Sequence, residues 1–349
     1  MPARERLLIS HRTLVEFVGA DTMRACMSDT DTEADHATPK PLLTYVDGLV
    51  ETLRALVPLA IRENKEDAIH DARVCTRRLK AAMDLLAPAV SEDQLKPFSR
   101  TLRKLRRRLG PLRDLDVMEG HLKELLARGA TRHADAIEWL ASRLRDERKC
   151  VRDDAADETP VTKVLSKLGQ WWGLREEIAD VCEARTTDEL LRVSLNRQLD
   201  EFSEAANRLT SPDNSSDETR VDPHAIRIAG KSLRYTLEMA KVDGHPLPAD
   251  VTKTFKRLQD ALGLWHDYVV LTERMLAMCS DEQLAHHDSA TQRRVLALAQ
   301  ATLQLAERYL AKFAEMWKSR GPDVSQAISA VFVQPGAVSG SQADPGPSC

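Results

Sequence analysis

Residues 68–80, AIHDARVCTRRLK, combine a histidine with Arg and Lys side chains that can hold an anion. On an α-helix each residue turns by about 100°, so residues three, four and seven apart share a flank. No acid would lie on the basic flank here, although like charges at these spacings repel by roughly a few tenths of a kcal/mol per pair. Guanidinium and ammonium groups in such a stripe suit phosphate oxygens. Alone, the stripe also fits an ordinary solvated helix face. Its members are His70, Arg73, Arg77 and Lys80.

A second basic segment occupies residues 96–113, KPFSRTLRKLRRRLGPLR, which contain no acid. The whole chain has a formal net charge of −4 from 50 basic and 54 acidic residues. The total charge is therefore uninformative, whereas the local charge indicates a basic surface.

Composition favours a helical protein without a membrane span or a secretory signal. The 349 residues are 42% hydrophobic and 30% charged, and the 4% of aromatic residues suits aliphatic helix packing better than a β-sandwich. No apolar run approaches the roughly 18 residues of a membrane helix, and the N-terminal apolar stretch is too short for a secretory signal. We therefore expect a cytoplasmic protein without a membrane partner. The six cysteines show no CxxC pattern, which predicts free thiols.

Helical periodicity runs through the chain between two polar ends. Residues 1–39 are rich in polar and acidic side chains, which predicts a mobile tail with one short helix near 5–18. Residues 335–349 are rich in Pro and Gly and are expected to be disordered. The polar run 210–222 predicts a loop.

An internal repeat relates the two halves of the helical region. HDARVCTRRLKAAMDLL (70–86) aligns with HAIRIAGKSLRYTLEMA (224–240) at an offset of 154 residues, 224 minus 70. RTLRKLRRRLGPLRDLDVM (100–118) aligns with KTFKRLQDALGLWHDYVVL (253–271) at an offset of 153, 253 minus 100. A nearly constant register indicates a duplicated unit. The basic and histidine pairs are His70/His224, Arg73/Arg227, Arg77/Lys231, Lys80/Arg234, Arg100/Lys253, Arg103/Lys256 and Lys104/Arg257.

The repeat predicts an all-α fold of two antiparallel helical bundles related by a pseudo-twofold axis. The first unit spans about 42–156, the second about 187–320, and residues 157–186 connect them. Trp171 and Trp172 in this connector are expected to pack at the seam between the halves rather than to bind a ligand.

Five helices are expected in each unit, because Gly and Pro clusters interrupt the periodicity. Gly110 and Gly263 should each close a helix, and Asp114 and Asp267 should help to begin the next one. The expected helices lie near 42–62, 67–87, 92–109, 112–128 and 132–156, and near 187–209, 222–241, 249–263, 267–279 and 286–319.

The repeat also favours an anion site over a solvated face. Leucines recur in any duplicated helix because the core requires them, whereas charges on a solvated face need not recur. Here the sign of the charge is preserved in both copies. We therefore predict that both stripes bind an anion.

Four segments in this order resemble the CHAD family, the conserved histidine α-helical domain. The family carries two helices of the pattern H-x-x-R-(V/I)-x-x-(K/R)-x-L-(K/R), each followed by a segment with L-G-x-x-x-D. The chain has HDARVCTRRLK with LRRRLGPLRDLD, and HAIRIAGKSLRY with LQDALGLWHDYV. The resemblance covers about 42–320 and implies a CHAD domain over 40–334.

The resemblance implies two helical bundles around a basic central channel that binds inorganic polyphosphate. It also implies a location on polyphosphate granules. The implied polyphosphate-binding residues are His70, Arg73, Arg77, Lys80, Arg100, Arg103, Lys104, His224, Arg227, Lys231, Arg234, Lys253, Lys256 and Arg257.

The second unit departs from the first in two ways. Its cationic surface is thinner, because Gln259 and Asp260 stand where the first unit has two arginines. His266 aligns with an arginine of the first unit, and it either adds a third imidazole to the site or only packs. Two roles stay open for His70 and His224. As charged ligands they would tighten binding as the pH falls from about 8 to about 6; otherwise they hydrogen-bond a neighbouring helix and orient the arginines.

Motifs of phosphate-transferring and metal enzymes are missing from the sequence: GxxxxGK[ST], HExxH and the Glu/Lys strands of triphosphate-tunnel enzymes. We therefore expect a binding protein without catalytic residues, metal or cofactor, and leave protein partners open.

Two alternatives remain. A nucleic-acid-binding protein could use RTLRKLRRR, although few aromatic residues and the net charge of −4 disfavour it. An enzyme acting on phosphate chains would need carboxylate metal ligands beside the stripes.

Overall fold

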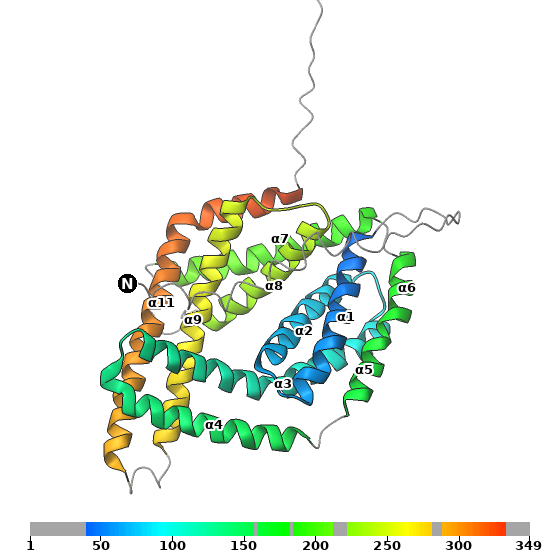
Figure 1. The fold of residues 1–349 in the computed structure, drawn as a ribbon. Helices are drawn as coiled ribbons and strands as arrows, with labels where there is room; N and C mark the ends of the chain where they lie inside the picture. The colour runs from blue at the N-terminus through cyan, green and yellow to red at the C-terminus, as the bar shows by residue number, and fades with distance from the viewer. Residues whose placement is uncertain (1–39, 157–159, 182–183, 212–221, 281–287, 333–349) are drawn as a thin grey trace, which may run out of the picture. The chain divides into compact units, whose positions relative to one another are not determined.

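The computed structural model describes residues 40–156, 160–181, 184–211, 222–280 and 288–332 (Figure 1). Every regular element in these ranges is a helix, so the predicted all-α class is confirmed. None of the described helices has the length and apolar character that a bilayer span needs. The predicted tails at 1–39 and 335–349 lie outside the described residues, as does most of the predicted loop at 210–222.

Two series of four long helices, all within the described residues, have the same order of neighbours. In each series the first helix packs on the second, the second on the third and the third on the fourth. This shared order agrees with the predicted duplication, which stays an interpretation together with its pseudo-twofold axis. The first series is α1 (Pro41–Ile61), α2 (Glu66–Leu86), α3 (Glu92–Ala127) and α4 (Ala134–Ala156), and the second is α7 (Ala184–Thr210), α8 (Pro223–Val242), α9 (Ala249–Cys279) and α11 (Ser289–Ser329).

The predicted connector contains two short helices that pack against the first series. Trp171 is fully buried, lies 5.7 Å from the ring of Phe98, and donates its indole N–H to Asp47 Oδ1 at 2.7 Å. Trp172 is exposed. The first tryptophan therefore fastens the connector to α1 and α3. The short elements are α5 (Val161–Gly169), α6 (Trp171–Val181) and two 3-10 turns, η1 (Thr131–His133) and η3 (Ala330–Phe332).

Local sequence signals start the helices that carry the basic stripes. Acidic Glu66 and Asp67 occupy the first turn of α2, where the helix dipole favours negative charge. Pro223 opens α8, and Asp222 Oδ1 accepts a hydrogen bond from the backbone N–H of His224 at 2.8 Å.

The predicted breaks at Gly110 and Gly263 are wrong, because α3 and α9 run through both glycines without interruption. The glycines with left-handed φ in the described chain are Gly129 and Gly244 instead. Buried leucines continue at helical spacing on both sides of Gly110, and their packing outweighs the roughly 1 kcal/mol that glycine costs inside a helix. The predicted helices 92–109 and 112–128 are therefore one helix, as are 249–263 and 267–279.

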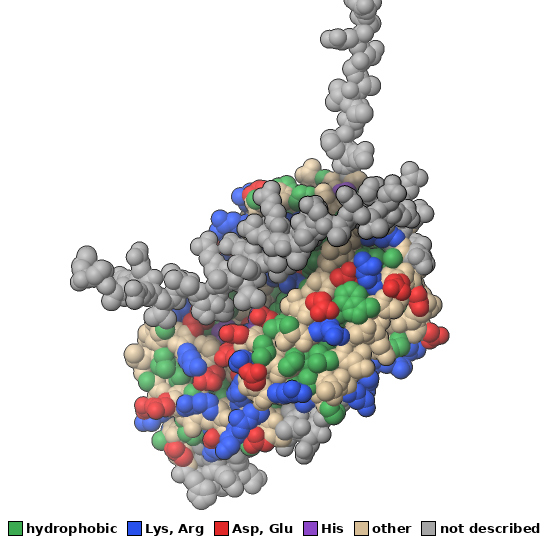
Figure 2. Space-filling model, turned by 45° about the vertical axis from the view of Figure 1, so that its right-hand side comes forward, with side chains coloured by type: hydrophobic (Ala, Val, Ile, Leu, Met, Phe, Trp, Pro, Cys, Tyr) green, Lys and Arg blue, Asp and Glu red, His purple; other side chains and the backbone are tan. Residues whose placement is uncertain are grey.

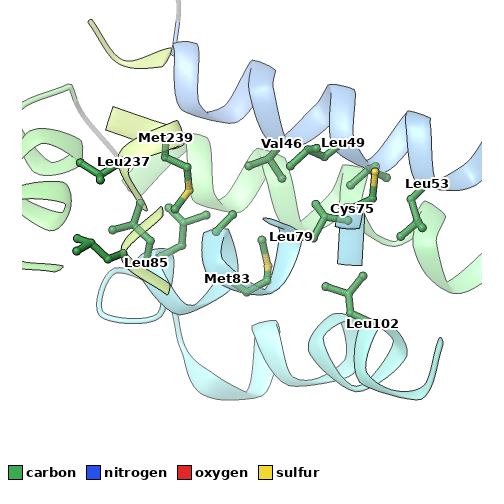
Figure 3. Packing of buried hydrophobic residues seen from close by; sticks show 14 of the residues in the cluster. Val46, Leu49, Leu53, Cys75, Leu79, Met83, Leu85, Leu102, Leu237 and Met239 are labelled. Atoms are coloured by element: carbon green, nitrogen blue, oxygen red, sulfur yellow. The ribbon is translucent and has the colours of Figure 1, made fainter. Parts of the chain in front are cut away.

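Two buried clusters hold the helices together, and α3 and α9 take part in both. In the first, Leu79 of α2 packs among residues of α1, α3 and α8, as the labelled side chains in Figure 3 show. The second joins the later turns of α3 and α9 to α4 and α11. Within α3 the change from one cluster to the other falls between Leu112 and Leu115, and within α9 between Leu262 and Tyr268. Polar residues at these crossings form the candidate site.

Candidate anion-binding site

Helices α2 and α8, which carry the two predicted stripes, contact each other. Burial lowers the pKa of Arg227 and of Lys231 on α8, and the positive charge of Arg77 on α2 lowers both further. Like charges that influence one another in this way must lie close together. Arg77 of α2 therefore lies close to Arg227 and Lys231 of α8.

Two aspartates lie among these cations. Arg73 Nη2 is 3.6 Å from Asp114 Oδ1, and Arg227 Nη2 is 4.0 Å from Asp267 Oδ1. The side chains of Arg227 and Asp267 are only 16% and 31% exposed, so water screens this pair weakly. In the other pair Arg73 is 12% exposed but Asp114 is 61% exposed, so water screens it more. The predicted role of the aspartates as helix starts is wrong, since both lie inside long helices and face the arginines instead.

Arg106 belongs to the same location, although we did not predict it from the sequence. Its carbonyl oxygen accepts a hydrogen bond from Arg73 Nη1 at 3.1 Å. Burial lowers the pKa of its guanidinium, and the charge of Arg77 lowers it further. The sequence could have indicated Arg106, because it lies four residues before Gly110 and residues four apart share a flank of a helix.

Positive charge is in excess at this site. Within the described part of the chain, Arg77, Arg106 and Lys231 form no direct ion pair with a carboxylate. Two aspartates therefore offset only part of the charge that the arginines and the lysine bring together. Burial of unpaired cations is costly, and an incoming anion would relieve that cost.

Histidines line the α8 and α9 side of the site. The rings of His224 and His266 lie 4.8 Å apart, centre to centre. Burial, with the nearby charge of Arg227, lowers the pKa of His266 to about 4, so this ring is neutral at pH 7. His121 of α3 places Nε2 3.5 Å from Asp267 Oδ2. Both a ligand role and a packing role for His266 remain compatible with this arrangement.

A cross-helix ion pair fixes α2 against α8 beside the site. Arg78 Nε donates to Glu238 Oε2 at 2.8 Å, and Arg234 Nε donates to Glu238 Oε1 at 3.1 Å. Arg78 was not among the predicted site residues, and its partner shows that it joins the helices.

The remaining predicted residues lie further out. His70, Lys80 and the six predicted basic residues of α3 and α9 are exposed, and Lys80 pairs with Asp84 on its own helix. Lys104 lies about 120° around α3 from Gly110, which faces Arg73, and Arg257 lies at the same offset from Gly263 on α9. Their contribution stays a prediction, as it does for Arg100, Arg103, Lys253 and Lys256.

The sequence profile of the CHAD domain matches residues 44–276, two thirds of the chain. The chain belongs to the CHAD domain family. Its fold resembles the crystal structure of the CHAD domain from the plant Ricinus communis, at 20% identity and a TM-score of 0.52, covering 87% of this chain and 95% of that one. It also resembles PptA from Streptomyces chartreusis, at 15% identity and a TM-score of 0.50, covering 78% and 99%. No curated protein matches the sequence.

Gly110 gives the first prediction for this CHAD domain. A Cβ at this position would come within 3.0 Å of Arg73 Nη1, whereas a Cβ at Gly263 would meet no atom within 4 Å. Gly110→Ala should therefore displace the Arg73 guanidinium and weaken polyanion binding roughly threefold. A threefold change corresponds to about 0.7 kcal/mol of binding free energy, since about 1.4 kcal/mol changes a binding constant tenfold.

Gly263→Ala is the matched control. Both changes should raise the free energy of unfolding by up to about 1 kcal/mol, because alanine favours a helix interior. Only Gly110→Ala should weaken binding in a titration. Equal binding by the two variants would show that the position of Arg73 does not matter.

Lys231 gives a prediction about pH. Burial, with the charges of Arg227 and Arg77, lowers the pKa of this lysine to about 7. A bound polyanion favours its charged form, so binding takes up a proton above pH 7. Affinity should rise as the pH falls from about 9 to about 7, by at most about tenfold per pH unit. Lys231→Met should remove this part of the pH dependence in titrations at both pH values.

The same pKa shift predicts a change in stability. The unfolded chain binds more protons than the folded one between pH 7 and the ordinary lysine pKa of 10.5. The buried charge of Lys231 therefore lowers the free energy of unfolding by its full amount below pH 7, and this effect disappears as the pH rises toward 10.5. Lys231→Met should stabilise the protein against urea more at pH 6.5 than at pH 10.5. An equal gain at both values would contradict the lowered pKa.

Proposed function

We propose that this CHAD domain binds inorganic polyphosphate at the junction of α2 and α8. The observation that carries the proposal is the convergence of Arg77 with Arg227 and Lys231, which belong to different copies of the repeat. A single basic helix face would be ordinary solvated surface, whereas two faces with buried cations at one location favour an anion.

The chemistry of polyphosphate fits this arrangement. Each phosphate along the flexible chain carries about one charge, and binding needs cations in a row rather than base recognition or aromatic stacking. Arginine offers a planar fork for two phosphate oxygens and lysine a point charge. Exposed cations on α3 and α9 could extend the row beyond the buried centre, and they include Arg100, Arg103, Lys253 and Lys256.

The face of the protein seen in Figure 2 carries charges of both signs. Figure 2 shows Lys and Arg side chains interspersed there with Asp and Glu, as expected for an ordinary solvated surface. A nonspecific attraction of the whole chain to polyanions is not expected from its net charge of −4. Selective binding therefore requires a local site.

The proposed activity is binding without catalysis, in the cytoplasm and on polyphosphate granules. Asp114 and Asp267 each face an arginine, and metal-assisted phosphate hydrolysis would require carboxylates arranged around a metal instead. In this account the site holds the phosphate chain and anchors the protein to it.

A competition titration tests the proposal. Labelled long-chain polyphosphate is bound to the 349-residue chain, and unlabelled polyphosphate, single-stranded nucleic acid or triphosphate is added. We expect unlabelled polyphosphate to compete best, because nucleic acid finds few aromatic partners here and triphosphate reaches few of the cations. Stronger competition by nucleic acid would overturn the proposal in favour of a nucleic-acid-binding protein. Release of phosphate during the titration would indicate an enzyme.

A further inference from the structure

A second cluster of ligand-type side chains lies at the other end of α8. It comprises Asp188 of α7 and two residues just beyond α8, Asp243 and His245. One donor atom from each residue lies within 4.8 Å of the others. Lys231 precedes Asp243 by twelve residues, or about 18 Å along the helix axis, so this cluster is separate from the anion site.

The backbone at the end of α8 holds Asp243 and His245 in place. Gly244 between them has φ +97°, which lets the chain reverse without side-chain strain. The N–H of His245 donates to the carbonyl of Ala240 at 2.8 Å, and the N–H of Asp243 donates to Met239 at 3.0 Å. The two side chains therefore project from a closed turn.

The imidazole of His245 is oriented from two directions. Its Nε2 lies 3.2 Å from Asp188 Oδ1, and its ring packs against Phe332 of η3 at 4.3 Å between centres. The carboxyl of Asp243 is next to that of Asp188, and burial together with this neighbour raises its pKa. One imidazole nitrogen and two carboxylates thus meet at a half-exposed place.

We propose that Asp188, Asp243 and His245 bind a divalent transition-metal ion of the Zn²⁺ class. Imidazole nitrogen with carboxylate oxygens suits such ions, whereas Ca²⁺ and Mg²⁺ prefer oxygen ligands alone. A dication would also relieve the repulsion between the two carboxylates. Three protein ligands leave coordination positions for water, since the cluster is partly open to solvent.

The ion would act as a clip between helices. It would join α7 to the turn between α8 and α9, while Phe332 keeps the imidazole in place. Binding to the folded state alone would stabilise the protein as the metal concentration rises. This inference does not depend on polyphosphate binding.

The test measures Zn²⁺ binding to the 349-residue chain after removal of metal with a chelator. Equilibrium dialysis gives the number of bound ions, and thermal unfolding with and without Zn²⁺ gives the stabilisation. We expect Asp188→Asn and His245→Gln each to weaken the binding of one Zn²⁺ ion by at least about tenfold. Replacing a residue that only supports a metal ligand already lowers metal affinity by about 10- to 100-fold. Each should also lose the Zn²⁺-dependent rise in Tm.

Asp250→Asn is the matched control, because it removes one negative charge from the first turn of α9, five residues after His245 in the sequence. It should bind Zn²⁺ like the unaltered protein. Other histidines and the cysteines can take up Zn²⁺, so only the difference between variants counts. Unchanged binding by Asp188→Asn and His245→Gln, or an equal loss in Asp250→Asn, would overturn the proposal and leave an ordinary His–Asp pair.

Discussion

Replacing Arg73 and Arg227 together with alanine should weaken polyphosphate binding by roughly 10²- to 10⁴-fold. Each guanidinium can form a charge-assisted hydrogen bond to phosphate of about 1.5–3 kcal/mol, and each 1.4 kcal/mol changes the dissociation constant about tenfold. The two arginines are among the least exposed cations of the site, so water replaces their contacts poorly. A fluorescence titration with labelled polyphosphate measures the loss.

The matched control removes two other arginines. Arg197 and Arg320 are more than half exposed and pair with acids of their own helices, so Arg197→Ala with Arg320→Ala changes the net charge equally. This control should bind within about twofold of the unaltered protein, because exposed pairs of this kind contribute little. Circular dichroism should show full helicity in both double variants. A loss of helicity in the first would instead assign the arginines a structural role.

Salt should weaken polyphosphate binding steeply. If the basic row neutralises about six to ten phosphates, affinity should fall by about 10³- to 10⁵-fold between 50 and 200 mM salt, by analogy with DNA. Titrations at several salt concentrations give the slope of log affinity against log salt. The arginine double variant should show a slope smaller by about two contacts.

A shallow slope would contradict an extended row of contacts. Binding that changes less than about tenfold over this range would mean that only one or two phosphates are neutralised. The ligand would then be small, and the exposed cations on α3 and α9 would not take part.

The basic stripes were predictable because helical spacing is regular. His70, Arg73 and Arg77 follow one another at offsets that any α-helix turns into a single flank, and the repeat supplied the second copy. The all-α class followed from the same periodicity. The meeting of the two stripes depends on packing between α2 and α8, which one sequence alone does not specify.

Other features could not be predicted because tertiary packing decided them. Gly110 and Gly263 carry a strong local signal for a helix end, yet the leucines around them continue into a second core and keep the helix intact. Asp114 then changes from an expected cap to a partner of Arg73. The cluster around His245 joins residues that lie more than fifty positions apart in the sequence, so no spacing reveals it.

The most direct test of whether α2 and α8 build one site is the number of polyphosphate molecules bound per chain. Isothermal titration with a short polyphosphate is carried out on the unaltered protein, on Arg73→Ala and on Arg227→Ala. If α2 and α8 build one site, all three proteins bind one ligand per chain, and each variant binds it more weakly. Two ligands per unaltered chain, with one lost in each variant, would show two separate sites and contradict the account.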